Sequence, residues 1–177
     1  MGRRGEAADV VLRLRRSHGS GQTVVVESTG MATTRLANER DQDRVLELLA
    51  QLWAVLPEPL EQSPERQEAR AKSFRRMVDS DRGAVLLAED NGQVLGMISM
   101  SFNLAIRYPT AYAQIEELVV DEAARGKQAG ALLVQAAIAE ARRRGCDEVG
   151  LYPRDETRAF YEKLGFKYVG VELRQPL

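Results

Sequence analysis

The sequence has almost none of the residues that build disulfide frameworks or metal centres. It contains one cysteine and one histidine among 177 residues, which excludes an internal disulfide and argues against a Cys/His metal site. No apolar run approaches the ~18 residues of a transmembrane helix. The net charge is −1, so no overall basic field would attract nucleic acid or a membrane. We therefore expect a cytoplasmic protein with no metal and with neither nucleic acid nor membrane as a partner.

The N-terminal stretch Met1–Gly30 differs from the rest in composition. It is rich in Gly, Ser and Arg, lacks helical or strand periodicity and contains the single histidine, His18. Its apolar core, Val10–Leu12, is too short for a signal peptide. We interpret residues 1–30 as a disordered tail, or as an extension from an expression vector or a mis-assigned start. Residues 31–177 are then one domain with room for a substantial core.

Two common phosphate-binding motifs are also missing. The chain has neither a Walker A motif nor a Gly-x-Gly-x-x-Gly fingerprint. Instead, the segment Arg125–Gly130 joins an extended, β-branched run ending at Val120 to a long amphipathic helix. The start of such a helix presents free backbone N–H groups and the positive end of the helix dipole. The sequence therefore predicts an anion site at this point, for phosphates above all.

The helix that follows this segment has a continuous apolar stripe at helical spacing. Gly145 is predicted to end it, and Arg142–Arg144 suit the negative end of its dipole. A nucleic-acid binder using these arginines is an alternative, but a nearly neutral chain without interleaved aromatic residues argues against it. The stripe consists of Gly130, Leu133, Val134, Ala137, Ile138 and Ala141.

Periodicity and turn residues predict the order of the elements. The Asn91-Gly92 pair is the strongest hairpin signal. Antiparallel strands come first and a strand–helix–strand unit follows, which predicts an α/β fold with a mixed, mostly antiparallel central sheet and helices on both faces. The predicted strands are 33–37, 84–89, 93–102, 112–120, 148–152 and 166–173. The first predicted helix begins near Asn38 or Asp41 and ends at Pro57. A second, more polar helix ends near Val78, and two further helices span 128–144 and 156–164.

Two segments resemble the GNAT superfamily of N-acetyltransferases. Arg125–Gly130 is similar to the pyrophosphate motif of that family, with Gln128 in place of the usual small residue. Asp155–Phe166 resembles the late FYEKLGF segment of the family, and Arg154 stands where an Asn is common. The resemblance covers roughly residues 84–171. It implies the GNAT fold, an N-acetyltransferase activity and acetyl-CoA as the cofactor.

The resemblance also implies which residues contact acetyl-CoA. Leu118, Val119 and Val120 would pair with the pantetheine arm as an added strand would. The pyrophosphate would be surrounded, mainly by backbone N–H groups, by Arg125, Gly126, Lys127, Gln128, Ala129, Gly130 and Ala131. Lys127 could also touch the 3′-phosphate, although a solvated lysine is the simpler interpretation.

An acetyl transfer requires a base for the amine and an acid for the leaving thiolate. An alkyl amine with a pKa of about 10.4 loses its proton at neutral pH at a cost of about 4–5 kcal/mol. Glu116 and Glu117 are the candidate bases, and strand alternation predicts that they point to opposite faces. The resemblance favours Glu116, acting through water. Tyr161 can donate the proton to the thiolate. The alternative interpretations are that Glu116 and Glu117 are ordinary surface residues and that Tyr161 is a core aromatic residue.

The resemblance further implies that the first two helices and their connection line the acceptor mouth. That region offers Trp53 and Glu58, with further acidic residues, so we expect a small-molecule or peptide amine that carries positive charge. A homodimer is left open as the assembly. A non-catalytic acyl-CoA-binding sensor or scaffold is the alternative function, and the departures at Gln128 and Arg154 motivate it.

Overall fold

The computed structural model describes residues 32–55 and 61–170. The predicted boundary at residue 30 and the predicted acceptor residue Glu58 lie outside them. The strands are β1 (Thr33–Leu36), β2 (Gly83–Asp90), β3 (Gln93–Leu104), β4 (Ala111–Val120) and β5 (Glu148–Gly150). The helices are α1 (Gln42–Ala54), α2 (Pro64–Val78), α3 (Ala129–Arg143) and α4 (Asp155–Lys163), with short 3-10 turns η1 (Glu39–Asp41) and η2 (Glu122–Ala124).

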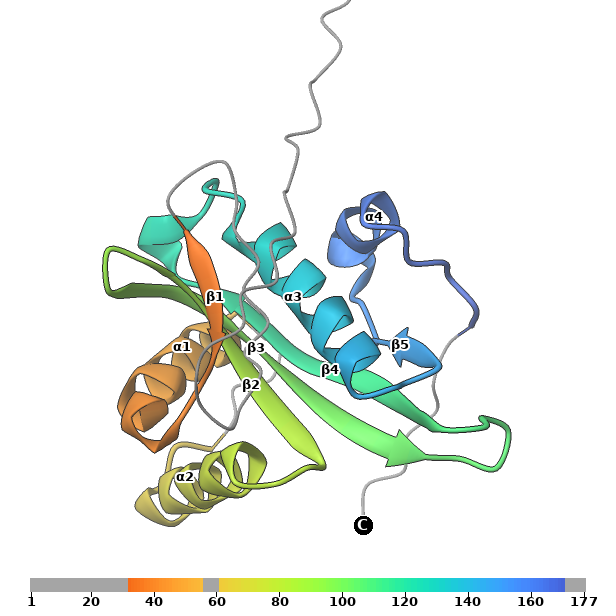
Figure 1. Ribbon diagram of the computed structural model, residues 1–177. Coiled ribbons are helices and arrows are strands. Elements are labelled where there is room, and N and C mark those ends of the chain that lie inside the picture. The colour runs from red at the N-terminus through yellow and green to blue at the C-terminus, as the bar shows by residue number, and fades with distance from the viewer. Residues whose placement is uncertain (1–31, 56–60, 171–177) are drawn as a thin grey trace, which may run out of the picture.

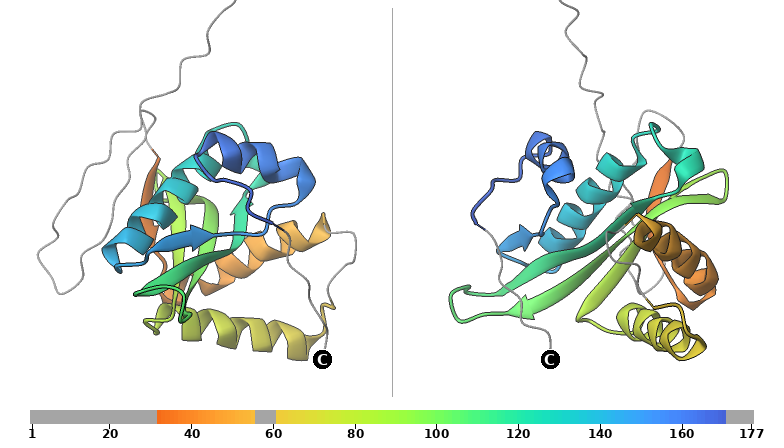
Figure 2. Two further views of the ribbon diagram at one scale, coloured as in Figure 1. Left: turned by 90° about the vertical axis from the view of Figure 1, so that its right-hand side faces the viewer. Right: turned by 180° about the vertical axis from the view of Figure 1, so that it is seen from behind.

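The strands form one sheet in the order β1-β2-β3-β4-β5. All neighbours are antiparallel except β4 and β5, which are parallel. Helices α1 and α2 cover one face and α3 covers the other, as the two turned views show (Figures 1 and 2). This confirms the predicted α/β class with a mixed sheet between helical layers.

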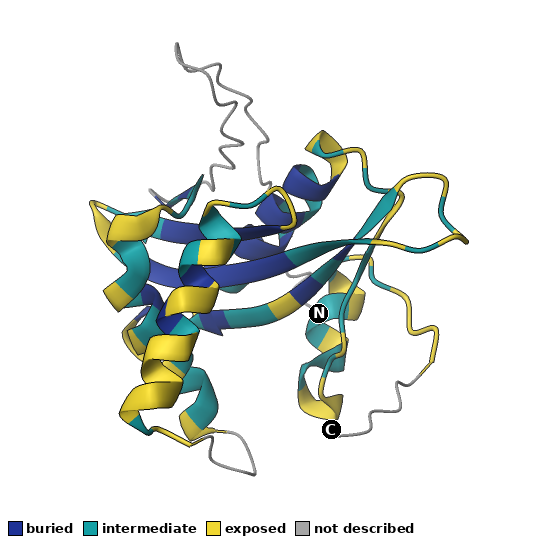
Figure 3. Cartoon of the chain, turned by 90° about the horizontal axis from the view of Figure 1, so that it is seen from below, coloured by how far each residue is buried: buried dark blue, intermediate teal, exposed yellow. Residues whose placement is uncertain are grey.

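Each face of the sheet has its own apolar core. The core under α3 centres on Ile98, Met100 and Leu133. The core under α1 and α2 joins Leu48 and Phe74 to Met97 and the other buried residues of that face. Burial is concentrated in the central strands, and the outer surfaces of α1 and α2 are exposed (Figure 3). Among the described residues, no helix is both long enough and apolar enough to span a bilayer.

Local signals place the elements where the sequence predicts them. Asn91 and Gly92 have φ values of 49° and 78°, as the tight hairpin between β2 and β3 requires. Asn38 caps η1 in a capping box with Asp41, and Pro64 occupies the first turn of α2, where its missing N–H is harmless. Gly145, with φ 74°, follows the end of α3.

The predicted closing strand at 166–173 is wrong over its described part. Residues 166–170 form no strand, and β5 is shorter than predicted, because it ends at Gly150. The three residue pairs that β5 forms with β4 provide a very short template for a further strand. Gly170 also has φ 144°, outside the range of a regular strand.

Candidate active site

A β-bulge in β4 shapes the centre of the site. Ser99 of β3 pairs with Glu117, whereas the next residue, Met100, pairs with Ile115. Glu116 is therefore the extra residue that has no partner across the ladder. A bulge of this kind bends the strand and changes which face the following side chains occupy.

The bulge brings the two carboxylates to the same face of the sheet. Ser101 Oγ donates a hydrogen bond to Glu116, and Ser99 Oγ donates one to Glu117. Ser99 and Ser101 are two residues apart on β3, so they share a face. The prediction that Glu116 and Glu117 point to opposite faces is therefore wrong, because strand alternation does not hold across a bulge.

Glu117 is the more buried member of the pair. It is half-buried, whereas Glu116 is exposed. Burial raises the pKa of Glu117 above its usual value, the nearby charge of Glu116 also raises it, and the hydrogen bond from Ser99 opposes the rise. Glu117 lies two residues before Val119, which packs in the core under α1 and α2. The carboxylate pair thus faces the layer of α1 and α2.

Strands β4 and β5 separate just beside this pair. Their ladder consists of Tyr112–Glu148, Ala113–Val149 and Gln114–Gly150. Strand β4 continues to Val120, but the edge from Ile115 onward has no strand beside it among the described residues. This unpaired edge includes the predicted pantetheine contacts Leu118, Val119 and Val120. It can therefore accept an extended ligand as an added strand.

The loop after β4 ends at an open helix N-terminus. Gly126 has φ 82°, and Gln128, the N-cap of α3, has φ 59° and ψ 8° with no side-chain cap bond. The first turn of α3 contains no acidic residue. In the described part of the chain, the backbone N–H groups of residues 128–131 have no hydrogen-bond acceptor. These four groups and the helix dipole point toward the same region.

Side chains near this loop differ in what they contact. Arg125 forms an exposed ion pair with Glu122 at 3.3 Å. Lys127 is exposed. A Cβ at Gly130 would meet Phe160 and Val120 at an ordinary 3.5 Å, so protein packing alone does not require glycine there. Ala129 is buried, and Ala131 is half-buried.

Helix α1 holds the start of this loop. Arg44 forms an ion pair with Asp121 and donates to the carbonyl of Val94 at 3.0 Å. Gln51 donates to Asp121 at 3.3 Å and accepts the N–H of Glu122 at 3.2 Å. The pKa of Asp121 is lowered, mainly by the hydrogen bond from Arg44. The loop that leads to α3 is therefore fixed to the opposite helical layer.

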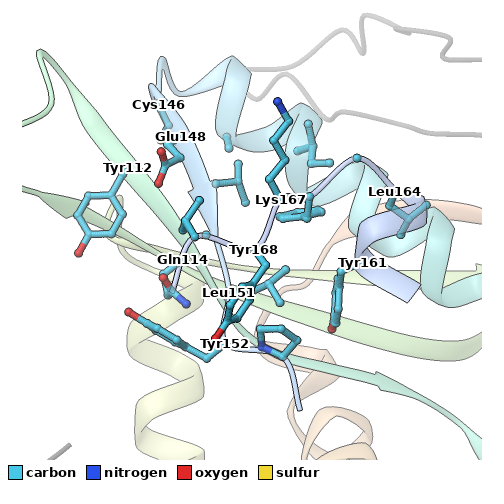
Figure 4. Close-up of a pocket in the computed structure, with 18 of the residues that line it drawn as sticks. Tyr112, Gln114, Cys146, Glu148, Leu151, Tyr152, Tyr161, Leu164, Lys167 and Tyr168 are labelled. Atoms are coloured by element: carbon cyan, nitrogen blue, oxygen red, sulfur yellow. The ribbon is translucent and has the colours of Figure 1, made fainter. Parts of the chain in front are cut away.

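Tyr161 approaches the site from α4. Its ring contacts Phe160 and Phe166 edge-on, with centroids 5.0 Å and 5.9 Å away, and burial raises the pKa of its hydroxyl. It lines a cleft of about 780 Å³. In the close-up, Gln114 lies between Tyr112 and Tyr161 (Figure 4). The cleft thus reaches the last residue pair of the β4–β5 ladder.

The structure does not gather all of the predicted residues in this cleft. The lining includes Tyr161 but neither Glu116 nor Glu117, and none of the residues 125–131. Helix α4 links the cleft to the start of α3, because Phe160 lies against Gly130 and contacts Tyr161. Tyr161 packs against the core under α3, and the carboxylates face α1. A carboxylate pair and a phenolic hydroxyl therefore flank the β4–β5 opening from opposite faces.

Trp53 lies in the last turn of α1, but one face of its indole ring is covered by an arginine side chain. The guanidinium of Arg70 lies 4.2 Å from the ring centroid, and it donates to the carbonyl of Glu61 at 2.6 Å and to Gln62 at 3.2 Å. Arg66 pairs with Glu61. The predicted acidic mouth therefore also contains two arginines.

Sequence reasoning missed Ser99, Ser101 and Arg70. The two serines alternate on β3, and only the register across the bulge reveals which carboxylate each one meets. Arg70 lies 17 positions after Trp53 in the chain, and cation–π pairing across two helices has no sequence signal.

An unpaired strand edge, an open helix N-terminus and flanking acid and base groups can together transfer an acyl group from a nucleotide thioester to a nucleophile. The chain belongs to the acetyltransferase (GNAT) family, whose model matches residues 45–166.

Three similar proteins agree with this membership. The "Aminoalkylphosphonate N-acetyltransferase" of Salmonella typhimurium is 34% identical over 84 residues, 46% of this chain and 54% of that protein. The "Probable glucosamine 6-phosphate N-acetyltransferase 2" of rice, Oryza sativa subsp. japonica, is 41% identical over 59 residues, 33% of this chain and 36% of that protein. A crystal structure of a Trypanosoma brucei acetyltransferase has a TM-score of 0.64 and 27% identity, covering 82% of this chain and 99% of that chain.

Proposed function

We propose that the protein transfers the acetyl group of acetyl-CoA to the primary amine of a small molecule. The observation that carries this proposal is the opening between β4 and β5 beside the N-terminus of α3, which has no side-chain cap. The pyrophosphate would bind the N–H groups of residues 128–131, and the pantetheine arm would follow the edge of Leu118–Val120. The thioester would then arrive between Tyr161 on one face and the carboxylate pair on the other.

Glu117 is the proposed base. The family resemblance favours Glu116, but burial supports Glu117, because a carboxylate with a raised pKa is a better proton acceptor at neutral pH. Glu117 would take the amine proton, directly or through water, as the amine attacks the acetyl carbonyl. The carbon–sulfur bond of the tetrahedral intermediate then breaks, and Tyr161 gives a proton to the departing thiolate.

The acceptor is proposed to be a small amine that also carries an anionic group. Both curated relatives are named for amines bearing a phosphate or a phosphonate. Arg66 and Arg70 supply positive charge at the mouth beside Trp53. A panel of glucosamine 6-phosphate, glucosamine, 2-aminoethylphosphonate and spermidine separates this class from the purely cationic amines that the sequence suggests.

The experiment measures acetyl-CoA binding by calorimetry and thiol release with the amine panel. The variants Glu117→Gln and Glu116→Gln form a matched pair, since each replaces a carboxylate by an amide of the same shape. We expect Glu117→Gln to lower kcat/KM about 10²–10⁴-fold, a much smaller loss for Glu116→Gln, and binding preserved in both. Absence of acetyl-CoA binding would refute the proposal. Binding without thiol release would favour the sensor function, which the departures at Gln128 and Arg154 motivate.

A further inference from the structure

We propose that Ser99 is a positioning residue that holds the Glu117 carboxylate in place and keeps it ready to accept the proton of the amine. This inference rests on the proposed function, because Glu117 is the base in that mechanism. It assigns a role in the reaction to a buried residue of β3 that contacts no predicted substrate atom.

The Ser99 hydroxyl binds Glu117 in two ways. Its Oγ donates to the side-chain carboxylate of Glu117 and accepts the backbone N–H of the same residue at 3.2 Å. Because that N–H approaches an oxygen lone pair, the hydroxyl proton is directed toward the carboxylate. The two bonds together fix both the strand and the side-chain rotamer at the bulge.

Water cannot easily replace this hydroxyl. Ser99 is 3% exposed, so a variant without the hydroxyl would leave Glu117 with one hydrogen bond fewer on the side that faces the buried strand β3. A carboxylate loses most when its partner is removed from a buried site. The dependence of Glu117 on Ser99 is therefore expected to be large for a single hydroxyl.

The charges around Glu117 leave Ser99 as its main stabilising contact. Burial and the charge of Glu116 both favour the protonated form of Glu117, and the Ser99 hydrogen bond is the interaction that favours the ionised form. Strand β3 carries no ionisable side chain. Arg44 and Glu47 of α1 pair with each other, and Arg44 also pairs with Asp121 at the end of β4.

On α2, Arg66 pairs with Glu61 and Arg75 pairs with Glu68, and Arg70 lies over Trp53. The acidic and phenolic groups of β5 and α4 also have other partners or lie on the opposite face. Glu148 of β5 accepts a hydrogen bond from Tyr108. Tyr161 of α4 packs against the core on the opposite face. Helix α3 covers that opposite face too, so its charged residues do not face the carboxylate.

The pair formed by Ser101 and Glu116 provides a matched control. Ser101 Oγ donates to Glu116 and accepts from Asn103 at 2.8 Å. This arrangement has the same chemistry two residues further along β3, but Glu116 is exposed and water can replace the hydroxyl. Removing the Ser101 hydroxyl should therefore have a much smaller effect than removing that of Ser99.

The test compares Ser99→Ala, Ser99→Cys, Ser99→Thr and Ser101→Ala in the full chain. The first readout is the pH dependence of kcat/KM for acetyl transfer to the most active amine of the panel. We expect Ser99→Ala to move the acidic limb to higher pH by about one unit, as the loss of one hydrogen bond to a charged group predicts. The Thr variant should restore the limb, the weak thiol donor of the Cys variant should give an intermediate shift, and Ser101→Ala should move it least.

A second readout needs no activity. Titration of the Glu117 carboxyl by carbon NMR in the unliganded protein should show the same upward shift in Ser99→Ala, or in Ser99→Cys if the alanine variant does not fold. An equal loss of kcat/KM at every pH, with an unmoved NMR titration, would overturn the role of Ser99. If the unsubstituted protein transfers no acetyl group, the proposed function fails, and the NMR titration still decides whether Ser99 controls Glu117.

Discussion

Gln128 offers a direct test of how the loop before α3 is built. Its backbone lies in the left-handed region, with φ 59° and ψ 8°, and its side chain makes no cap bond. A left-handed conformation costs an ordinary residue about 1–2 kcal/mol, and glycine avoids this cost but loses about 0.5–1 kcal/mol to its greater freedom in the unfolded chain. We therefore expect Gln128→Gly to stabilise the protein by about 0.5–1 kcal/mol, despite deleting a side chain.

The assay is thermal or urea unfolding of three variants. For a protein of this size the gain corresponds to a rise in Tm of about 1–4 °C. Gln128→Ala removes the same side chain but keeps the left-handed cost, so it should not stabilise. Asn91→Gly changes the other non-glycine residue with positive φ, where asparagine already tolerates the conformation, and its gain should be smaller than that of Gln128→Gly.

Binding measurements on the same variants test the phosphate site. If the Gln128 side chain leans away from the pyrophosphate and only its N–H contributes, Gln128→Gly and Gln128→Ala should bind acetyl-CoA within roughly twofold of the parent, because no hydrogen bond is lost. Equal stabilisation by Gly and Ala, or destabilisation by Gly, would refute the conformational argument. A large loss of affinity in both variants would show that the side chain itself is a ligand.

Three further outcomes are expected. Tyr161→Phe should lower kcat by at least tenfold, within the range of about 10²–10⁴ for general acids, and unchanged turnover would restrict Tyr161 to packing. Glu140 is fully buried and pairs with Arg143 and Arg144. The substitution Glu140→Gln should lower the free energy of unfolding by only about 2 kcal/mol, since the two arginines still reach water. Burial would raise the pKa of Glu140, but hydrogen bonds from both arginines outweigh it and the net pKa is lowered. Its stabilisation is therefore present above the unfolded pKa and is lost as the pH falls through the folded one, so the parent and Glu140→Gln should converge in acid-unfolding curves, and parallel curves would contradict this. Gln51→Ala should raise the KM for acetyl-CoA several-fold with little change in kcat, because it frees the loop before α3, and an effect on kcat alone would contradict the positioning role.

Much of the fold follows from local signals in the sequence. The stripe from Leu133 to Ala141 and the stop at Gly145 predict α3 closely, because an amphipathic helix needs only periodicity and a C-terminal glycine. The Asn91-Gly92 hairpin follows from two residues that tolerate positive φ. These features depend on neighbours in the chain, so the sequence alone is sufficient to predict them.

The features that the sequence did not predict correctly depend on residues that are far apart in the chain. The bulge at Glu116 is a property of the register between β3 and β4, and one extra residue reverses the faces expected from alternation. The strand predicted from 166 has suitable β-branched and aromatic residues, but a strand also needs an edge to pair with. The contact of Ser99 with Glu117 arises only after that register is known.

Helix α1 has a consequence for how the two substrates influence each other. Arg44 and Gln51 of this helix bind the loop between β4 and α3, and its last turn carries Trp53 at the proposed acceptor mouth. Because an α-helix of 13 residues is stiff, a displacement of one end should also displace the other end. Occupation of either site should then alter the affinity of its counterpart, and thermodynamic reciprocity requires the factor to be the same in both directions.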